Sequence, residues 1–310
     1  MAVKKVILSC AVTGGIHTPS MSPYFPYTAE AIIDAAVGAA EAGASMVHIH
    51  ARKEDGRPTP DVNVMEKILS GIKKRNDNIV IGITTGGLYM KIEERMAAIP
   101  RLKPEIASLN AGSMNFVLSG LAKTIEGHEK YDWETPFLKN TYGQIFNNSF
   151  SDIETALTMM NANGTKPEIE VFDLGQLYNI AYFYNKGMIP KPVFLQFVLG
   201  VQGSPALNID NLMLMISRAK TLFGNDVEYS IVAGGRRAFR LEAFNAINGG
   251  HCRVGMEDSL YIKPDGTQAT SNAQQVAKMK KILEMLDFEV ATPDEAREIL
   301  KLKGSDKVSY

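Results

Sequence analysis

The sequence contains no apolar run that approaches the roughly 20 residues needed to cross a bilayer. Residues 1–6 lead directly into a predicted strand and lack the apolar core of a signal peptide. There are only two cysteines, Cys10 and Cys252, and both lie in apolar segments typical of buried strands, so no disulfide framework is expected. These absences predict a cytoplasmic protein without a membrane partner.

The sequence also lacks an excess of charge of either sign. Its 310 residues carry a net charge of −1, and no basic face stands out. A near-neutral balance of this kind argues against a nucleic-acid partner. The length allows one large α/β barrel or two smaller domains, and no linker, repeat or low-complexity run divides the chain.

Eight apolar, strand-like segments alternate with segments of helical character. The strands are expected at residues 6–12, 45–51, 79–84, 106–110, 168–172, 193–199, 227–232 and 252–255. This alternation predicts an α/β fold, a (β/α)8 TIM barrel formed by residues 1–310 as a single domain with a C-terminal helical extension. An open, doubly wound sheet is the second possibility, but no G-x-G-x-x-G motif follows the first strand.

Helices are expected at residues 29–41, 61–75, 93–99, 176–185, 208–223, 240–248 and 271–286. Three helix starts have recognisable capping residues. Thr28 precedes the first helix, Ser151 with Glu154 forms a capping-box pattern after a long polar insertion, and Thr292 with Glu295 forms another.

His48 and His50 lie at the end of the second predicted strand. Side chains two residues apart on a strand point to the same face, so both imidazoles would meet at one point. Imidazole pairs of this kind suit Zn²⁺ or a related divalent ion. Two polar residues that reach solvent at a strand end are the simpler interpretation, and the spacing alone does not exclude it.

Glu257 and Asp258 follow the eighth predicted strand, which closes onto the first strand of a barrel beside the second. Glu257 can therefore reach the two histidines and complete a three-ligand metal site with open positions. Arg253 could orient Asp258 as a general base. An ordinary acidic loop and a structural ion pair at the barrel rim are the competing interpretations.

Other polar groups and glycines collect where predicted strands end, which is where a barrel places its catalytic loops. They include Thr84, Gly86, Gly87, Ser108, Asn110 and Glu170. The glycines allow a ligand to approach the backbone closely, or they only form tight turns. Arg236, Arg237 and Arg240 form a basic cluster, which is either a solvated helix start or an anchor for an anionic cofactor.

Taken together, these motifs resemble the β-keto acid cleavage enzymes, typified by 3-keto-5-aminohexanoate cleavage enzyme. The resemblance covers nearly the whole chain in one order. It includes His-Ile-His-Ala-Arg at 48–52, Asp-Gly-Arg-Pro at 55–58, Thr-Thr-Gly-Gly at 84–87, Ser-Leu-Asn-Ala-Gly at 108–112, Gln-Phe-Val-Leu-Gly at 196–200, Gly-Gly-His-x-Arg at 249–253 and Glu-Asp at 257–258.

The resemblance implies a Zn²⁺-dependent TIM barrel that forms a homotetramer. It implies that a β-keto acid and acetyl-CoA are converted to acetoacetate and a new acyl-CoA by a Claisen-type exchange. By motif match His48, His50 and Glu257 would bind the metal, and Asp258, oriented by Arg253, would be the base. Thr84, Ser108 and Glu170 match positions that line the substrate pocket.

Two positions depart from the family pattern. Ile16 stands where the member that acts on an amino-bearing substrate has a glutamate, so a cationic substrate is not expected here. Ser259 replaces the asparagine common after Glu-Asp, a change without an interpretation. A metal-dependent aldolase or lyase that uses no CoA and a non-catalytic binding protein remain the competing hypotheses.

Overall fold

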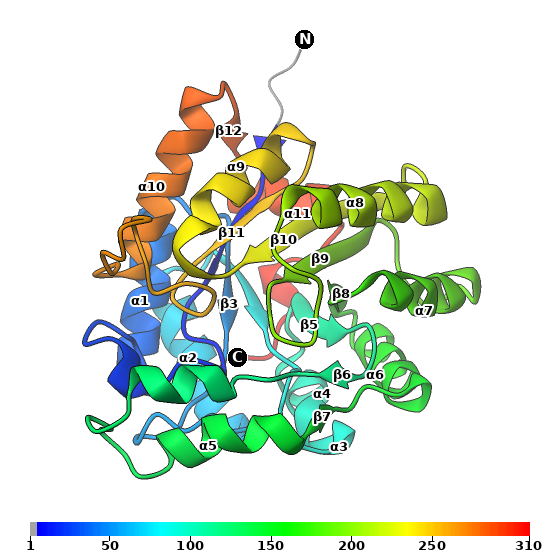
Figure 1. Ribbon diagram of the computed structural model, residues 1–310. Helices are drawn as coiled ribbons and strands as arrows, with labels where there is room; N and C mark the ends of the chain where they lie inside the picture. Colours follow the sequence, from blue (N-terminus) through cyan, green and yellow to red (C-terminus); the bar gives the residue numbers. More distant parts are fainter. Residues whose placement is uncertain (1–4) are drawn as a thin grey trace.

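The computed structural model describes residues 5–310 and has at its centre a barrel of eight parallel strands (Figure 1). The strands pair in the order β10-β9-β8-β5-β4-β3-β2-β11. They are β2 (Leu8–Ala11), β3 (Met46–Ile49), β4 (Val80–Ile83), β5 (Ile106–Asn110), β8 (Lys166–Val171), β9 (Val193–Leu199), β10 (Val227–Ala233) and β11 (Cys252–Val254). The predicted α/β class and barrel are confirmed.

Closure of the barrel depends on the two end strands of this order, β10 and β11. A parallel bridge joins Ser230 to His251, and the His251 N–H donates to the carbonyl oxygen of Tyr229 at 2.7 Å. The His251 ring adds a second link, since its Nε2 lies 3.1 Å from Oε2 of Glu228 on β10. These contacts join the two edges, so the open doubly wound sheet is wrong.

The predicted first strand, residues 6–12, divides into two. Its start forms β1 (Lys5–Val6), which pairs with β12 (Glu289–Val290) outside the barrel, and the rest forms β2. Beside this pair, an apolar cluster closes the end of the barrel where the strands begin. It joins Ile7, Met46, Val80, Ile106 and Phe194 to Ala291, Ala296 and Leu300.

Helices cover the outside of the barrel. They are α1 (Ala29–Glu41), α2 (Val62–Arg75), α3 (Ile92–Met96), α4 (Ala98–Leu102), α6 (Phe150–Ala162), α7 (Leu174–Asn185), α8 (Ile209–Phe223), α9 (Ala238–Ile247), α10 (Asn272–Met285) and α11 (Pro293–Leu300). Within α1, Ile32, Ile33 and Ala36 recur at helical spacing and are buried in the core. The predicted C-terminal extension has two parts, because α10 packs between α1 and α9 whereas α11 contributes to the cluster at the strand starts.

Two predicted helix boundaries were wrong. Helix α6 begins at Phe150, and the capping box is formed by Ser149 and Asp152, because the Ser149 hydroxyl accepts from the Asp152 N–H. Ser151 and Glu154 already lie within the helix. The single helix expected at residues 93–99 is two short helices, α3 and α4. Pro100 lies in the first turn of α4, where a missing N–H costs no helical hydrogen bond.

The insertion between β5 and α6 folds over the mouth of the barrel. It contains β6 (Met114–Asn115) paired antiparallel with β7 (Ile145–Phe146), the 3-10 helices η2 (Ser119–Thr124) and η3 (Thr141–Gly143), and α5 (Glu134–Asn140). Its inner side is apolar: Met114, Phe116, Leu118 and Phe146 pack with Phe172 and Val198 from the strand ends. Across residues 5–310, every helix is too short or too polar to span a membrane.

Candidate active site

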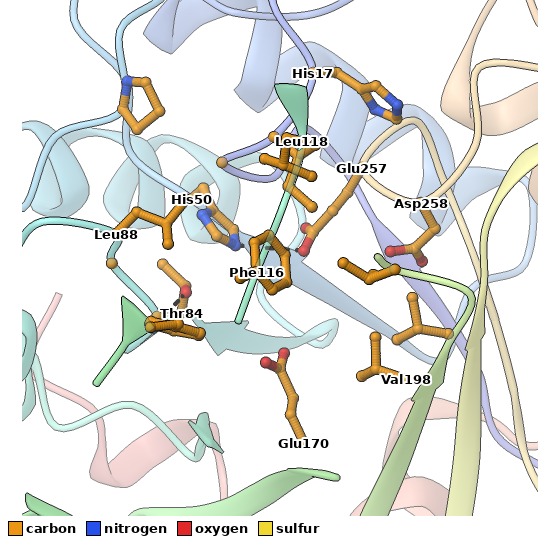
Figure 2. A pocket seen from close by; sticks show the side chains of 18 of the residues that line it. His17, His50, Thr84, Leu88, Phe116, Leu118, Glu170, Val198, Glu257 and Asp258 are labelled. Carbon is orange, nitrogen blue, oxygen red and sulfur yellow. Dashed lines mark hydrogen bonds and ion pairs between the residues drawn. The ribbon is translucent and has the colours of Figure 1, made fainter. Parts of the chain in front are cut away.

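The three predicted metal ligands meet at the mouth of the barrel. His48 is on β3, His50 follows it, and Glu257 comes from the loop after β11. Oε1 of Glu257 lies 3.4 Å from Nε2 of His50 and 3.8 Å from Nε2 of His48. One ligand atom from each residue lies within 4.8 Å of the others. Figure 2 shows His50 and Glu257 pointing toward one another within the cavity.

This donor set fits a divalent metal ion. Three buried atoms of this set have no hydrogen-bond partner among residues 5–310. They are both ring nitrogens of His48 and Oε2 of Glu257. Burial lowers the pKa of His48 to about 3, so the ring is neutral and its lone pair is free to bind a metal. Burial opposes ionisation of Glu257, but Arg253 and the two imidazoles outweigh it and hold its pKa well below the usual range.

Two glycines allow this close packing. Gly14 has a φ of +64°, and a Cβ there would lie 2.3 Å from Cγ of Glu257. Gly255 has a φ of +140°, and a Cβ there would lie 2.0 Å from the carbonyl oxygen of Ala11. Any side chain at either position would therefore displace the loop that carries Glu257.

Asp258 is held in a fixed orientation by Arg253. The guanidinium Nε donates to Oδ2 of Asp258 at 2.9 Å, and Nη2 donates to Oδ1 at 3.0 Å. Nη2 also donates to Oε1 of Glu257 at 2.8 Å. A two-point pair of this kind fixes the plane of the carboxylate. Burial outweighs the attraction to Arg253 and raises the pKa of Asp258, which favours a group that accepts and returns a proton.

Glu168 was assigned no role from the sequence, yet it lies behind His48. Its Oε2 is 3.8 Å from Nδ1 of His48, and Gln196 donates to its Oε1 at 3.0 Å. Gln196 in turn accepts from Nη1 of Arg253 at 2.7 Å, so one buried network links a predicted ligand to the predicted base. The signal in the sequence was the spacing of Glu168 and Glu170. They are two residues apart on β8 and share a face, as the histidines do near β3.

Arg52 is a second residue whose role the sequence did not show. Its buried guanidinium donates to the carbonyl oxygens of Gly14 at 2.7 Å, His17 at 2.8 Å and Gly56 at 2.6 Å. It thereby joins the loops that follow β2 and β3. Arg52 is the last residue of the His-Ile-His-Ala-Arg motif, and through these hydrogen bonds it supports the backbone around the histidines.

Above these residues lies a cavity of about 790 Å³. Its lining includes the predicted residues Thr84, Gly86, Gly87, Glu170, Arg253, Glu257 and Asp258, together with His50. Glu170 reaches into the cavity, and burial raises its pKa to about 8, so it is largely protonated at neutral pH (Figure 2).

Ser108 and Asn110 are not among the lining residues. Ser108 is buried, and its hydroxyl accepts from the backbone N–H of Thr85 at 3.1 Å. Asn110 is buried behind Gly86, and neither polar atom of its amide has a partner within residues 5–310. The structure thus places Ser108 in support of the loop after β4, while Asn110 keeps its hydrogen-bonding capacity.

The walls of the cavity are largely apolar. The ring of Phe116 lies 5.8 Å from that of Phe146 and 5.9 Å from that of Phe172, in edge-to-face geometry. Leu88, Val198 and Ile16 join this cluster. Sequence periodicity did not identify these positions, because Phe116 and Phe146 belong to a long insertion without strand or helix repeats.

Comparisons with known proteins identify the family of the chain. A family model described as beta-keto acid cleavage enzyme matches residues 5–302. The chain is 45% identical to the 3,5-dioxohexanoate:acetyl-CoA acetone transferase of Paraburkholderia graminis, over 100% of both chains. It is 34% identical to the 3-keto-5-aminohexanoate cleavage enzyme of Fusobacterium nucleatum, over 97% of this chain and 99% of that one.

A solved structure shares the fold at lower identity. It is the ternary complex of ObcA with C4-CoA adduct and oxalate, with a TM-score of 0.73 and 21% identity. The match covers 91% of this chain and 68% of the ObcA chain.

Proposed function

The chain belongs to the beta-keto acid cleavage enzyme family, and from this we propose that it exchanges acyl groups between a β-keto acid and acetyl-CoA. The products are acetoacetate and the acyl-CoA of the original keto acid. The observation that carries the proposal is the convergence of His48, His50 and Glu257 beside Asp258, which Arg253 orients at the floor of an apolar cavity.

His48, His50 and Glu257 would hold the metal, and zinc suits two imidazoles and one carboxylate. When bound, a divalent ion supplies a positive charge that polarises the ketone of the substrate and stabilises the negative charge formed there. Glu168 would fix the His48 ring through Nδ1, as carboxylates commonly do behind metal-binding histidines.

Asp258 would remove a proton from C2, the carbon between the ketone and the carboxylate. C2 then attacks the thioester carbonyl of acetyl-CoA, and CoA leaves as the thiolate. The thiolate attacks the original ketone carbon, and the bond from C2 to that carbon breaks. Asp258 returns its proton to C2, so acetoacetate and a new acyl-CoA leave with every proton accounted for.

The apolar wall made by Phe116, Phe146 and Phe172 would exclude water, which would otherwise hydrolyse the thioester or protonate C2 early. Arg253 would keep Asp258 turned toward C2. Protonated Glu170 can donate a hydrogen bond to a neutral carbonyl without adding a negative charge to the cavity.

The substrate we propose is a β-keto acid of the 3,5-dioxohexanoate type, which has no cationic group. Ile16 lines the cavity and packs in its apolar cluster, so nothing at this position pairs with an ammonium group. The relative with 45% identity is named for 3,5-dioxohexanoate, which carries no cation. Ile16→Glu should shift preference toward an amino-bearing keto acid, and no gain on that substrate would contradict this assignment.

The decisive experiment combines metal analysis with a panel of β-keto acids. Each is incubated with acetyl-CoA, and acetoacetate and the new acyl-CoA are measured together. Acetoacetate formed in step with acyl-CoA supports the proposal. Cleavage that continues without acetyl-CoA would indicate an aldolase or lyase, and purified protein that binds no metal and turns nothing over would favour a binding protein.

The cytoplasmic location, expected from the composition, and the homotetramer, implied by the family resemblance, remain predictions. Light scattering during size-exclusion chromatography measures the oligomeric mass directly. A mass of a single chain at working concentrations would contradict the tetramer.

A further inference from the structure

The loop after β10 lies directly beside Asp258. Gly234 and Gly235 line the cavity, and a Cβ on Gly234 would lie 3.5 Å from the carbonyl oxygen of Asp258. The hydroxyl of Ser259 donates to the carbonyl oxygen of Gly235 at 2.8 Å. The chain then continues into Arg236 and Arg237, which are exposed. Two guanidinium groups thus follow a loop that forms part of the cavity wall.

No carboxylate of residues 5–310 lies within ion-pair distance of these guanidinium groups, although Asp265 is near enough to Arg236 to interact with it electrostatically. Within the part of the chain that the structure describes, Arg236, Arg237 and Arg240 form no ion pair. Arg236 instead lies over the ring of Tyr261, 5.1 Å from its centroid. Helix α9 begins at once after Arg237, with no side-chain cap and no acidic residue in its first turn. The positive end of the helix dipole is therefore added to the charge of the arginines.

The other charged loops at the mouth have no comparable excess. Residues 50–61 contain three Lys or Arg and three Asp or Glu side chains. Residues 111–149 contain three basic and four acidic side chains, and residues 255–271 contain one basic and three acidic side chains. In contrast, residues 234–237 contain two arginines and no acid. An anion that enters the cavity therefore meets its most favourable surface at the loop after β10.

We propose that Arg236 and Arg237 bind the phosphate groups of the CoA co-substrate. This rests on the proposed acyl exchange, in which the thioester must come close to Asp258. The long pantetheine arm allows the thioester to lie in the apolar cavity while the phosphates stay at the rim. Arginine suits phosphate because its planar donors match the phosphate oxygens. In barrels of this type the loops after the seventh and eighth strands frequently bind phosphate, and β10 is the seventh strand in chain order.

The test compares wild-type protein with Arg236→Gln/Arg237→Gln, using the metal-loaded enzyme. Binding of CoA, 3′-dephospho-CoA and pantetheine is measured by isothermal titration calorimetry. We expect the variant to bind CoA about tenfold or more weakly, since charge-assisted hydrogen bonds to phosphate are lost. The KM for acetyl-CoA should rise in parallel, with a much smaller change for S-acetylpantetheine, which has no nucleotide phosphate.

The dephospho-CoA measurement identifies the phosphate involved. A loss seen with CoA alone indicates the 3′-phosphate, and a loss seen with both nucleotides indicates the pyrophosphate. Equal affinity of the variant and the wild type for CoA would overturn the proposal. So would an equal loss for CoA and pantetheine, because that pattern indicates a general disturbance of the cavity.

A matched control removes the same charge far from the mouth. Lys74 and Lys307 are exposed and form no ion pair within residues 5–310, and Lys74→Gln/Lys307→Gln should bind CoA as the wild type does. Weaker CoA binding by this control would show that the loss comes from net charge, and would overturn the specific role of the arginines.

Binding measured by calorimetry does not depend on turnover. A wild type that binds CoA through the arginines but forms no acetoacetate would therefore refute the acyl exchange alone.

Discussion

Glu168 and Glu170 show how two residues on one face of β8 acquire different roles. Glu168 is buried and Glu170 is partly buried, and burial raises the pKa of Glu168 to about 7 and that of Glu170 to about 8. Only Glu168 approaches His48, at 3.8 Å from Nδ1. Glu170 lines the cavity instead. One carboxyl is therefore placed to orient a proposed metal ligand, and the other lies where the proposed substrate would bind.

Glu168→Gln should weaken metal binding about tenfold, because an amide orients the His48 ring less strongly than a carboxylate does. Metal affinity is measured by competition with a chromophoric chelator. Glu170→Gln is the matched control, since it changes the same group on the same strand without a contact to His48. Equal metal affinities for both variants would contradict the role assigned to Glu168.

Lys166 predicts a pH dependence of stability at the opposite end of the barrel. Its Nζ donates to the carbonyl oxygen of Pro190 at 3.0 Å, and burial, with a smaller effect of Lys301, lowers the pKa of Lys166 to about 8. Between pH 8 and the ordinary lysine pKa, the unfolded chain binds a proton that the folded chain does not. The free energy of unfolding should therefore gain a favourable contribution from Lys166 as pH rises through this range.

Urea unfolding at pH 7.5 and at pH 9.5 measures this contribution. The Lys166→Met variant has no amine to titrate, so the difference in stability between wild type and variant should shift in favour of the wild type at the higher pH. A stability difference that stays constant between the two pH values, or shifts the other way, would contradict the lowered pKa of Lys166.

At the scale of single elements, the start of α6 separates two serines that look alike in the sequence. Ser149 caps the helix and forms a capping box with Asp152, whereas Ser151 lies in the first turn and is exposed. Ser149→Ala should reduce the free energy of unfolding by about 1 kcal/mol. Ser151→Ala should have almost no destabilising effect, because alanine is a better helix former than serine.

Chemical unfolding of both variants checks this, with Ser151→Ala as the control for Ser149→Ala. A larger loss for Ser151→Ala would mean that the helix starts two residues later, as the sequence pattern alone had indicated. The error in that pattern has a physical cause: serine followed by an acid three residues later occurs twice here, at 149 and 151. Only the path of the chain out of β7 decides which serine adopts the extended cap conformation.

Strands were predicted more accurately than the insertion. Residues 106–110 and 193–199 coincide with β5 and β9, because a buried parallel strand is a continuous apolar run. Residues 111–149 form short helices and one antiparallel pair of two-residue strands, β6 and β7, without a dominant period. Their apolar side was not recognised, since Phe116 and Phe146 meet only after the chain has turned back on itself.

For the whole molecule, the proposed metal site joins distant parts of the chain at one end of the barrel. His48 and His50 come from the region of β3, Glu257 follows β11, and β2 lies between these strands. A metal bound by all three stabilises the folded state only, since the unfolded chain does not assemble the site. Stability and metal concentration should therefore be coupled.

Removal of metal with a chelator should lower the midpoint of thermal unfolding without loss of helical circular dichroism, because the barrel core does not depend on the site. A metal concentration one hundred times the dissociation constant should add about 2.7 kcal/mol to the free energy of unfolding. His50→Ala should reduce this dependence strongly. If added zinc does not change the unfolding midpoint of the wild type, the three-residue metal site is contradicted.

The sequence alone determined the alternation of strands and helices, and it placed His48 and His50 on one face, since these patterns depend on local backbone periodicity. It did not determine that β10 meets β11, that Glu168 stands behind His48, or that Arg236 and Arg237 border the wall beside Asp258. Those arrangements depend on contacts between residues far apart in the chain, which closure of the barrel brings together. The separation has a simple physical origin: periodicity specifies the direction of a side chain, and only tertiary packing decides what that side chain meets.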